Sequence, residues 1–257
     1  MPHDDFDLTR LEAARLVDRL EYHPSLASTN DYLRELAARV PHHENMLVIA
    51  EGQTAGRGRG GNRWWTGPGS LAFSLLFDPA ARRIAQRHFP MLSLAAAVAL
   101  IETAAPLVGQ EEIGLHWPND VFAAGRKLAG ILVEALADGR HVLGIGCNIN
   151  NRASDAPVEL AGVVVTLADL SNRRHDRTSV LLVLLERLND AFEQLARAPA
   201  SLALHANKLC LQHGQRLTLC AGSRRTTGRC AGIGDDGALL LDTPAGRERF
   251  YSGVLLK

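Results

Sequence analysis

Residues 51–69 constrain this chain most, because their composition fits neither a helix nor a strand. The stretch contains seven glycines, three arginines and the adjacent pair Trp64 and Trp65, with no valine, isoleucine or leucine. Glycine costs backbone entropy in either regular structure, and no apolar residue recurs at a helical or strand period. Glycine lets backbone N–H groups approach an anion, and arginine grips phosphate or carboxylate through paired hydrogen bonds. We therefore expect a loop that closes over a phosphate-bearing substrate.

The composition narrows the class of protein. The chain has 257 residues, 46% of them hydrophobic, which suffices for one large domain or for a main domain and a small one. Its formal net charge is zero, so charge gives no support for a nucleic-acid partner. The most apolar run, residues 92–101, is too short to span a bilayer, and we expect a cytoplasmic protein without a membrane partner. The four cysteines lack metal-ligand spacing, which favours free thiols over a zinc site.

The apolar runs predict an α+β domain with a mixed or antiparallel sheet, since strands and helices do not alternate as regular βαβ units. After residue 213, short strand-like runs separated by turn residues predict a small all-β, barrel-like domain. We place the domain boundary so that residues 1–208 form the first domain and residues 209–257 the second. The expected helices are 8–20, from about 31, 90–108, from about 178 and 199–208; the expected strands are 46–50, 70–77, 127–135, 139–151, 216–220, 226–233, 238–242 and 248–251, with a hairpin at 114–126.

Three small polar residues, Ser28, Thr29 and Asn30, come directly before an expected helix. A hydroxyl here could simply cap the helix, and this is the favoured interpretation. A cap does not need three polar side chains in a row, so binding of a ligand's polar head is the alternative. At the N-terminus, Thr9 and Glu12 have the spacing of a capping box.

Several charged residues are candidates for chemistry. Arg57 and Arg59 alternate with glycines, but the stretch is neither a P-loop nor a Rossmann fingerprint. Lys127 lies near Gly130, and a glycine within a strand often marks close approach of a ligand or of another backbone. Positions 127 and 130 are an odd number of residues apart, so their side chains point to opposite faces of a regular strand unless a bulge intervenes. We expect Lys127 to lie just before the strand. Asp120 could bind Mg²⁺ or pair with an arginine; the second is favoured, and metal ligands stay unassigned.

The residues alone therefore predict a nucleotide-handling or phosphate-handling enzyme. Five motifs in order make the prediction more specific, because together they resemble the biotin protein ligases (biotin–[acetyl-CoA-carboxylase] ligases) over most of the chain from Ser28 onward. They are S-T-N at Ser28, E-G-Q-T-A-G-R-G-R-G at Glu51, W-P-N-D at Trp117, K-L-A-G-I-L-V-E at Lys127 and G-x-N-I-N around Asn148.

The resemblance implies a class II synthetase-like catalytic domain with a mixed sheet, followed by an SH3-like β-barrel. It implies an ATP-dependent ligase that uses Mg²⁺, forms biotinyl-5′-AMP and transfers biotin to a lysine of a biotin carboxyl carrier domain. Some members carry an N-terminal helix-turn-helix and act as repressors. Few residues precede Ser28 here, so we expect a ligase that binds no nucleic acid. A homodimer formed through an exposed sheet edge is left open.

The resemblance also implies residue roles. Lys127 and Arg59 would be catalytic, with Lys127 bridging the activated carboxylate and the α-phosphate. Trp64 would stack on adenine, and Asn148 would contact the adenylate. His116 stands where the family usually has a lysine. Biotin would contact Ser28, Thr29, Asn30, Gln53, Arg57, Gly58, Arg59, Lys127, Gly130 and Leu132, and the nucleotide would contact Arg57, Arg59, Trp64, Lys127 and Asn148.

Three rival functions remain for a chain of this pattern. A lipoate ligase of similar fold would carry a loop resembling R-R-x-S-G-G-G, which is not found here. A non-catalytic biotin or adenylate sensor would not need Lys127 and Arg59. A DNA-binding repressor would need a DNA-binding module and basic charge.

Overall fold

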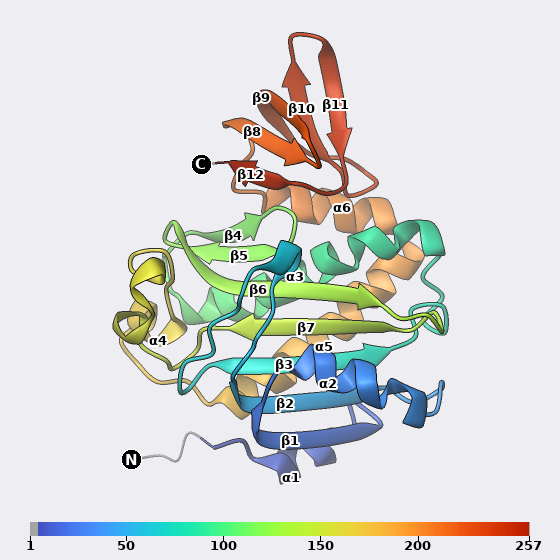
Figure 1. The fold of residues 1–257 in the computed structure, drawn as a ribbon, viewed down its shortest axis with the longest axis vertical. Helices are drawn as coiled ribbons and strands as arrows, with labels where there is room; N and C mark the ends of the chain where they lie inside the picture. The colour runs from blue at the N-terminus through green and yellow to red at the C-terminus, as the bar shows by residue number, and fades with distance from the viewer. Residues whose placement is uncertain (1–4, 257) are drawn as a thin grey trace.

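A seven-stranded mixed sheet forms the larger part of the molecule, in the order β1-β2-β3-β7-β6-β5-β4 (Figure 1). The computed structural model describes residues 5–256. Only β1 and β2 are parallel, and every other neighbouring pair in this sheet is antiparallel. The strands are β1 Arg19–Leu26, β2 Met46–Gln53, β3 Leu71–Phe77, β4 Ile113–His116, β5 Asp120–Ala123, β6 Arg126–Ala135 and β7 His141–Cys147.

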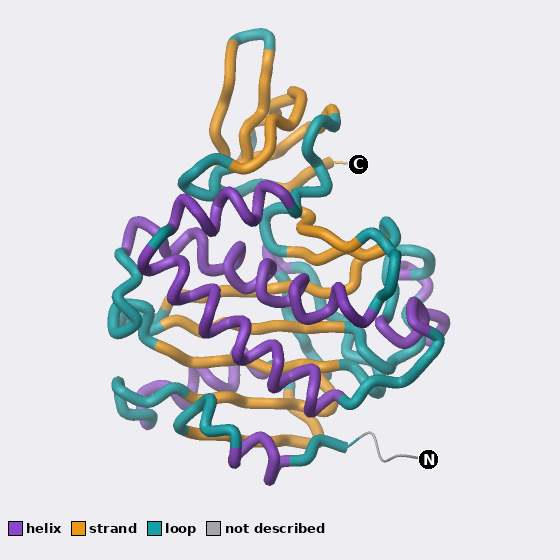
Figure 2. The backbone as a smooth tube through the Cα atoms, turned by 180° about the vertical axis from the view of Figure 1, so that it is seen from behind, coloured by secondary structure: helices purple, strands orange, loops and turns teal. Residues whose placement is uncertain are grey.

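Helices cover both faces of this sheet, because its central strands are apolar on both sides. The long helices cross one face, as Figure 2 shows from behind, and enclose the main core. On the opposite face α2 packs Leu33 against Val48 and Val142 in a smaller cluster. The helices are α1 Leu8–Ala13, α2 Thr29–Leu36, α3 Leu92–Ala104, α4 Leu167–Ser171, α5 Arg177–Arg197 and α6 Pro199–Lys208.

A five-stranded antiparallel sheet follows α6 and lies at one end of the molecule (Figure 1). Its order is β11-β10-β9-β8-β12. Turn residues between the strands, such as Gly222 and Gly237, have positive φ, which glycine adopts without steric cost. The strands are β8 Arg216–Ala221, β9 Arg224–Ile233, β10 Leu239–Thr243, β11 Gly246–Phe250 and β12 Val254–Leu256.

The predicted α+β class, with a mixed sheet and a small C-terminal β domain, is confirmed. Most predicted elements lie within a few residues of those observed, and the prediction for α6 matches its bounds. The helix predicted from 90 to 108 is α3 flanked by 3-10 turns. The strand predicted from 139 to 151 ends at Cys147, and β12 was not predicted.

The prediction of one helix over residues 8–20 is wrong. Helix α1 ends at Ala13, and Arg15 has a positive φ of 52°, which a helix does not accommodate. The capping-box prediction is also wrong, because Asp7 is the cap and accepts from the backbone N–H of Arg10.

Strand β1 was missed altogether. It carries Pro24 and no continuous apolar run, so its sequence does not read as a central strand. It lies at the edge of the sheet and pairs only with β2. An edge strand tolerates proline and polar residues because one of its sides needs no partner in the sheet.

The segment Gln86–Leu107, which contains α3, is long and apolar enough to cross a membrane by length and composition alone. In the structure, 67% of its most apolar window is buried inside the molecule. Burial of this extent is typical of a core helix that packs under a sheet.

The C-terminal part is joined to the large sheet through the segment after α6. The backbone N–H of Leu115 donates to Leu209, and the N–H of Leu211 donates back to Leu115, so this segment extends the sheet beyond β4. The buried Trp117 indole N–H donates to the carbonyl of Gly237 at 3.3 Å.

Gly114 permits this junction, because a Cβ there would lie 2.7 Å from the Leu209 carbonyl oxygen and 2.7 Å from the Leu211 side chain. We predict that Gly114→Ala lowers the free energy of unfolding by about 1–3 kcal/mol through overpacking. Denaturant unfolding measures it. Gly52→Ala is the matched control, since its Cβ would meet no atom closer than 3.9 Å. Equal stability of the two variants would contradict the prediction.

Candidate functional site

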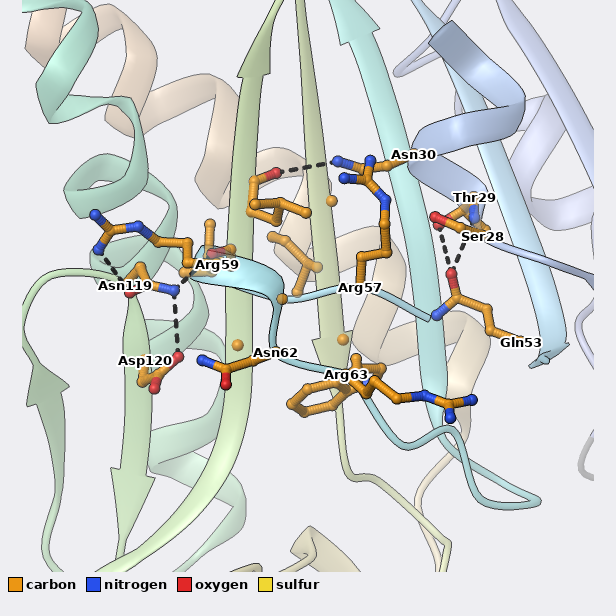
Figure 3. Close-up of a pocket in the computed structure, with 18 of the residues that line it drawn as sticks. Ser28, Thr29, Asn30, Gln53, Arg57, Arg59, Asn62, Arg63, Asn119 and Asp120 are labelled. Atoms are coloured by element: carbon orange, nitrogen blue, oxygen red, sulfur yellow. Dashed lines mark hydrogen bonds between the residues drawn. The ribbon is translucent and has the colours of Figure 1, made fainter. Parts of the chain in front are cut away.

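One cavity of about 110 Å³ lies on the face of the sheet that carries α2, under the glycine-rich loop (Figure 3). All ten residues predicted to contact biotin line it, as does Trp64. They come from the start of α2, the end of β2, the loop and β6, so four separate parts of the chain converge. Other lining residues are Asn62, Arg63, Phe73, Asn119, Asp120, Ile131, Gly144, Ile145 and Gly146.

A continuous chain of hydrogen bonds forms one wall of the cavity. Ser28 caps α2 and accepts from the N–H of Asp31 at 3.3 Å, so the predicted cap is confirmed. Thr29 donates to Gln53 Oε1 through its backbone N–H (2.9 Å) and its hydroxyl (3.2 Å). The cap therefore accounts for Ser28 alone, and Thr29 and Asn30 are turned to the interior, each 3% exposed.

Ser74 on β3 joins the two interior residues and was not predicted. Its hydroxyl lies 2.7 Å from Thr29 Oγ1 and 2.6 Å from Asn30 Oδ1. Because the run L-A-F-S-L-L-F is typical of a buried apolar strand with one small polar residue, nothing in the local pattern indicates this role.

Residues 56–64 of the glycine-rich loop form a small hairpin over the sheet. The N–H of Gly58 donates to Asn62 at 2.7 Å, and the N–H of Trp64 donates to Gly56 at 2.8 Å. At the tip, Gly60 and Gly61 have φ values of 63° and 83°, which favour glycine. Figure 3 shows the hairpin crossing in front of the strands, with its arginines reaching to different sides.

Arg57, on one side of the hairpin, is held by two carboxylates. Its guanidinium donates to both oxygens of Glu134, at 2.6 and 3.1 Å, and its Nε donates to Asp31 at 3.0 Å. The hydrogen bond that Arg57 donates to Glu134 is the main reason that the pKa of Arg57 is raised. Burial opposes ionisation of Glu134, but hydrogen bonds from Arg57 and Asn30 outweigh it and lower the pKa of this carboxyl.

Two further cations, Arg59 and Lys127, lie across the cavity from Arg57. Arg59 Nη1 donates to Asn119 Oδ1 at 3.2 Å. Lys127 Nζ lies 2.8 Å from Asp120 Oδ2 and 5.7 Å from the centroid of the Trp64 ring. Asp120 thus pairs with a lysine, where the sequence favoured an arginine. The W-P-N-D motif supplies both acceptors.

Lys127 and Gly130 reach the same cavity because β6 contains a bulge. Phe122 pairs with Lys127, whereas the preceding Val121 pairs with Ala129, so β6 has one extra residue there. The bulge was one of the two predicted solutions. The expectation that Lys127 precedes the strand is wrong, since β6 begins at Arg126.

Trp64 fills part of the cavity. A Cβ at Gly146 would lie 2.2 Å from its indole, and a Cβ at Gly130 would lie 3.2 Å from it. The close approach of a ligand or another backbone at Gly130 stays a prediction, since the close contact in this structure is made by the protein's own indole ring. The indole N–H is buried and has no hydrogen-bond partner among residues 5–256.

Two residues singled out from the sequence lie outside this cavity. Asn148 is 1% exposed, follows β7 and accepts from Asn151 at 3.0 Å, so the structure does not bring its side chain to the cavity wall. His116 stacks on Phe122 with ring centroids 4.6 Å apart, and it borders a neighbouring groove beside the C-terminal sheet.

Two family models match the chain. Residues 22–150, half of the chain, match the Biotin/lipoate A/B protein ligase family. The chain belongs to this family. Residues 213–254 match the Biotin protein ligase C terminal domain.

Relatives and solved structures agree with that assignment. The chain is 32% identical over 241 residues to "Bifunctional ligase/repressor BirA" of Bacillus subtilis, covering 91% of this chain and 72% of the relative. It is 36% identical over 218 residues to "Biotin--[acetyl-CoA-carboxylase] ligase" of Mycobacterium tuberculosis, covering 84% and 80%. The structure is similar to that of a biotin protein ligase from Aquifex aeolicus in complex with biotin and ATP, with a TM-score of 0.78, 28% identity and coverage of 93% and 98%.

We predict that Gly146→Ala expels the Trp64 indole from the cavity, because the added methyl would overlap the ring. The emission of Trp64, obtained as the difference between each protein and its Trp64→Phe counterpart, should shift to longer wavelength in Gly146→Ala. Gly52→Ala provides the control, with an unchanged difference spectrum. A Trp64 spectrum that is the same in Gly146→Ala and the parent would contradict the observed packing.

Proposed function

We infer that this chain is an ATP-dependent biotin–[acetyl-CoA-carboxylase] ligase, which makes biotinyl-5′-AMP and transfers biotin to a lysine of a biotin carboxyl carrier protein. One observation carries the inference. The residues that the motifs assign to biotin, although scattered from Ser28 to Leu132, line a single cavity with the cationic groups that adenylation needs. Similarity to ligases along most of the chain supports it.

Charge determines what the residues must do in the first step. An oxygen of the biotin carboxylate attacks the α-phosphorus of ATP and pyrophosphate leaves, so two anions meet and negative charge builds on the phosphoryl oxygens and the leaving group. We propose that Lys127 lies between carboxylate and α-phosphate, with Arg59 on the phosphates, where preorganised cations stabilise the developing charge most. Release from Asp120 would free Lys127 for that contact, because the two groups are paired at 2.8 Å in this structure.

The remaining roles concern binding and exclusion of water. We propose that Ser28, Thr29, Asn30 and Gln53 bind the ureido head, and that Gly130 and Leu132 flank the rest of biotin. Arg57 and Gly58 then close over the carboxylate with the hairpin. Trp64 leaves Gly146 to stack on adenine, and Asn148 reaches the adenylate after local rearrangement. A closed hairpin protects the anhydride from hydrolysis.

We propose that Mg²⁺ accompanies ATP. The residues fit such an ion, because Asp120 and Asn119 place a carboxylate and an amide oxygen at the cavity. Magnesium is usually held by one or two carboxylates together with substrate phosphates. When bound there it would neutralise phosphate charge and assist departure of pyrophosphate.

Several further features of the proposed ligase are predictions. The division into a catalytic domain of residues 1–208 and a C-terminal domain of residues 209–257 stays a prediction. So do the cytoplasmic location, the homodimer through a sheet edge and the lack of binding to nucleic acid.

Two rivals differ from the proposal in measurable ways. A lipoate ligase is disfavoured because the C-terminal residues match the biotin protein ligase C-terminal domain. A non-catalytic sensor would bind biotin without turnover. Pyrophosphate release that depends on biotin, followed by labelling of a carrier domain, tests the proposed function directly. Lipoate-dependent release, or biotin binding with no release, would overturn it.

We predict that Lys127→Ala lowers kcat for biotin-dependent pyrophosphate release by about 10²- to 10³-fold, as removal of one preorganised charge does elsewhere. Arg126→Ala is the control, because Arg126 adjoins Lys127 on β6 but does not line the cavity. Full adenylation by the Lys127→Ala enzyme would remove Lys127 from the catalytic group.

We predict that biotin plus ATP slows cleavage by trypsin after Arg57, Arg59 and Arg63, because the hairpin closes over both ligands. Mass spectrometry of the fragments over time gives the rate at each site. Cleavage in the C-terminal strands, after Arg225 for example, is the internal control. Equal rates with and without ligands would contradict closure of the hairpin.

A further inference from the structure

Glu134, the last residue of the K-L-A-G-I-L-V-E motif, has no role in the function proposed above. It lies on β6, and strand alternation places it on the same face as Gly130 and Leu132. Its side chain is 21% exposed, so most of the carboxylate is withdrawn from water. A carboxylate in such a place requires partners.

The partners of Glu134 belong to two different parts of the site. Oε2 accepts from Asn30 Nδ2 at 2.8 Å, and it also accepts from Arg57 Nη2 at 2.6 Å. Oε1 accepts from Arg57 Nη1 at 3.1 Å. Asn30 belongs to the polar wall of the cavity, whereas Arg57 belongs to the hairpin. Figure 3 shows these two side chains pointing toward each other above the sheet.

We propose that Glu134 is a positioning residue that ties the glycine-rich hairpin to the wall proposed to bind the biotin head. A single carboxylate fixes the amide orientation of Asn30 and, at the same time, the guanidinium of Arg57. The inference rests on the proposed function, since it assigns Asn30 to the ureido head.

Asp31 serves as the natural comparison. It also holds Arg57, at 3.0 Å to Nε and 2.8 Å to Nη2, but within residues 5–256 its carboxylate forms no hydrogen bond with the side chain of Asn30. Removing the charge of Asp31 therefore loosens the hairpin, and a pair with Arg34 within α2, without removing a hydrogen bond of the Asn30 side chain. Removing the charge of Glu134 loosens the hairpin and also the amide of Asn30.

Glutamine at position 134 separates these effects without a change in size. A carboxylate accepts from both donors, whereas an amide has one acceptor oxygen and directs its NH₂ group at a second donor. Oε2 alone accepts from both Asn30 and Arg57 Nη2, so the amide oxygen of Glu134→Gln can occupy its place. Because this oxygen is a neutral and weaker acceptor, both hydrogen bonds weaken, and the NH₂ group removes the hydrogen bond from Arg57 Nη1.

The experiment uses two readouts on the full chain. The first is the rate of cleavage by trypsin after Arg57, Arg59 and Arg63 without ligands. The second is the Kd of biotinol, in which an alcohol replaces the acid, because its binding does not depend on a charge contact with Arg57. Asp138→Asn is the control, since Asp138 pairs with Arg140 away from the cavity.

Glu134→Gln should raise the cleavage rate and the Kd of biotinol by about tenfold each, the equivalent of one charged hydrogen bond. Asp31→Asn should raise the cleavage rate but leave the Kd of biotinol within about twofold. Asp138→Asn should change neither. If Glu134→Gln does not fold, Glu134→Asp, which is too short to reach both partners, should show the same pattern.

A change in only one readout for Glu134→Gln, or equal effects of Glu134→Gln and Asp31→Asn on biotinol, would overturn the proposal. Failure of the proposed function is a separate result. If the unmodified chain binds no biotinol, the assignment to biotin fails, whereas the trypsin rates still report whether Glu134 holds the hairpin.

Discussion

Charge pairing between the glycine-rich hairpin and the sheet beneath it is the constraint on which the rest of the site depends. Three arginines lie in a segment with no valine, isoleucine or leucine, so apart from Trp64, which packs on Gly130 and Gly146, the hydrophobic effect does little to hold it in place. Carboxylates of α2 and β6 hold it instead, through Glu134 and Asp31 on Arg57. An attachment made of partly exposed ion pairs is weak enough to open. A lid over a reactive anhydride must both close and release product, and ion pairs of this kind are suited to both.

The seven-stranded sheet supplies the rigid part of the site. Its central strands are apolar on both faces, and helices on one side and α2 on the other enclose them. Functional side chains therefore project from elements whose positions the core fixes. The bulge in β6 adjusts this frame by a single residue, which brings Lys127 to the face that carries Gly130. Glycines at 130 and 146 leave space above the strands, and in this structure Trp64 occupies it.

Arg57 lies on one side of the site, and Arg59 and Lys127 lie on the other. This separation corresponds to the two anions that must meet. Arg57 lies beside the polar wall formed by Thr29, Asn30 and Gln53, where the neutral head and the acid of biotin are proposed to bind. Arg59 and Lys127 lie beside Asn119 and Asp120, where phosphates are proposed to bind. In this structure each cation has a protein partner, so binding of substrate is an exchange of partners. Such an exchange avoids leaving a charge unpaired in a partly buried site.

The local pattern of the chain was sufficient for the class of fold, the unusual loop and the motifs that name the family, because apolar periodicity and glycine content depend on neighbours in sequence. Residues 199–208 and the turns of the C-terminal sheet follow from such signals. Strand β1 could not be predicted from local pattern, since its place at the sheet edge is defined by its pairing with β2 and not by its own polar residues. The pairing of Glu134 with both Asn30 and Arg57 joins residues 104 and 77 positions apart. Only packing in three dimensions creates that contact, because no short-range preference encodes which distant donors a carboxylate will meet.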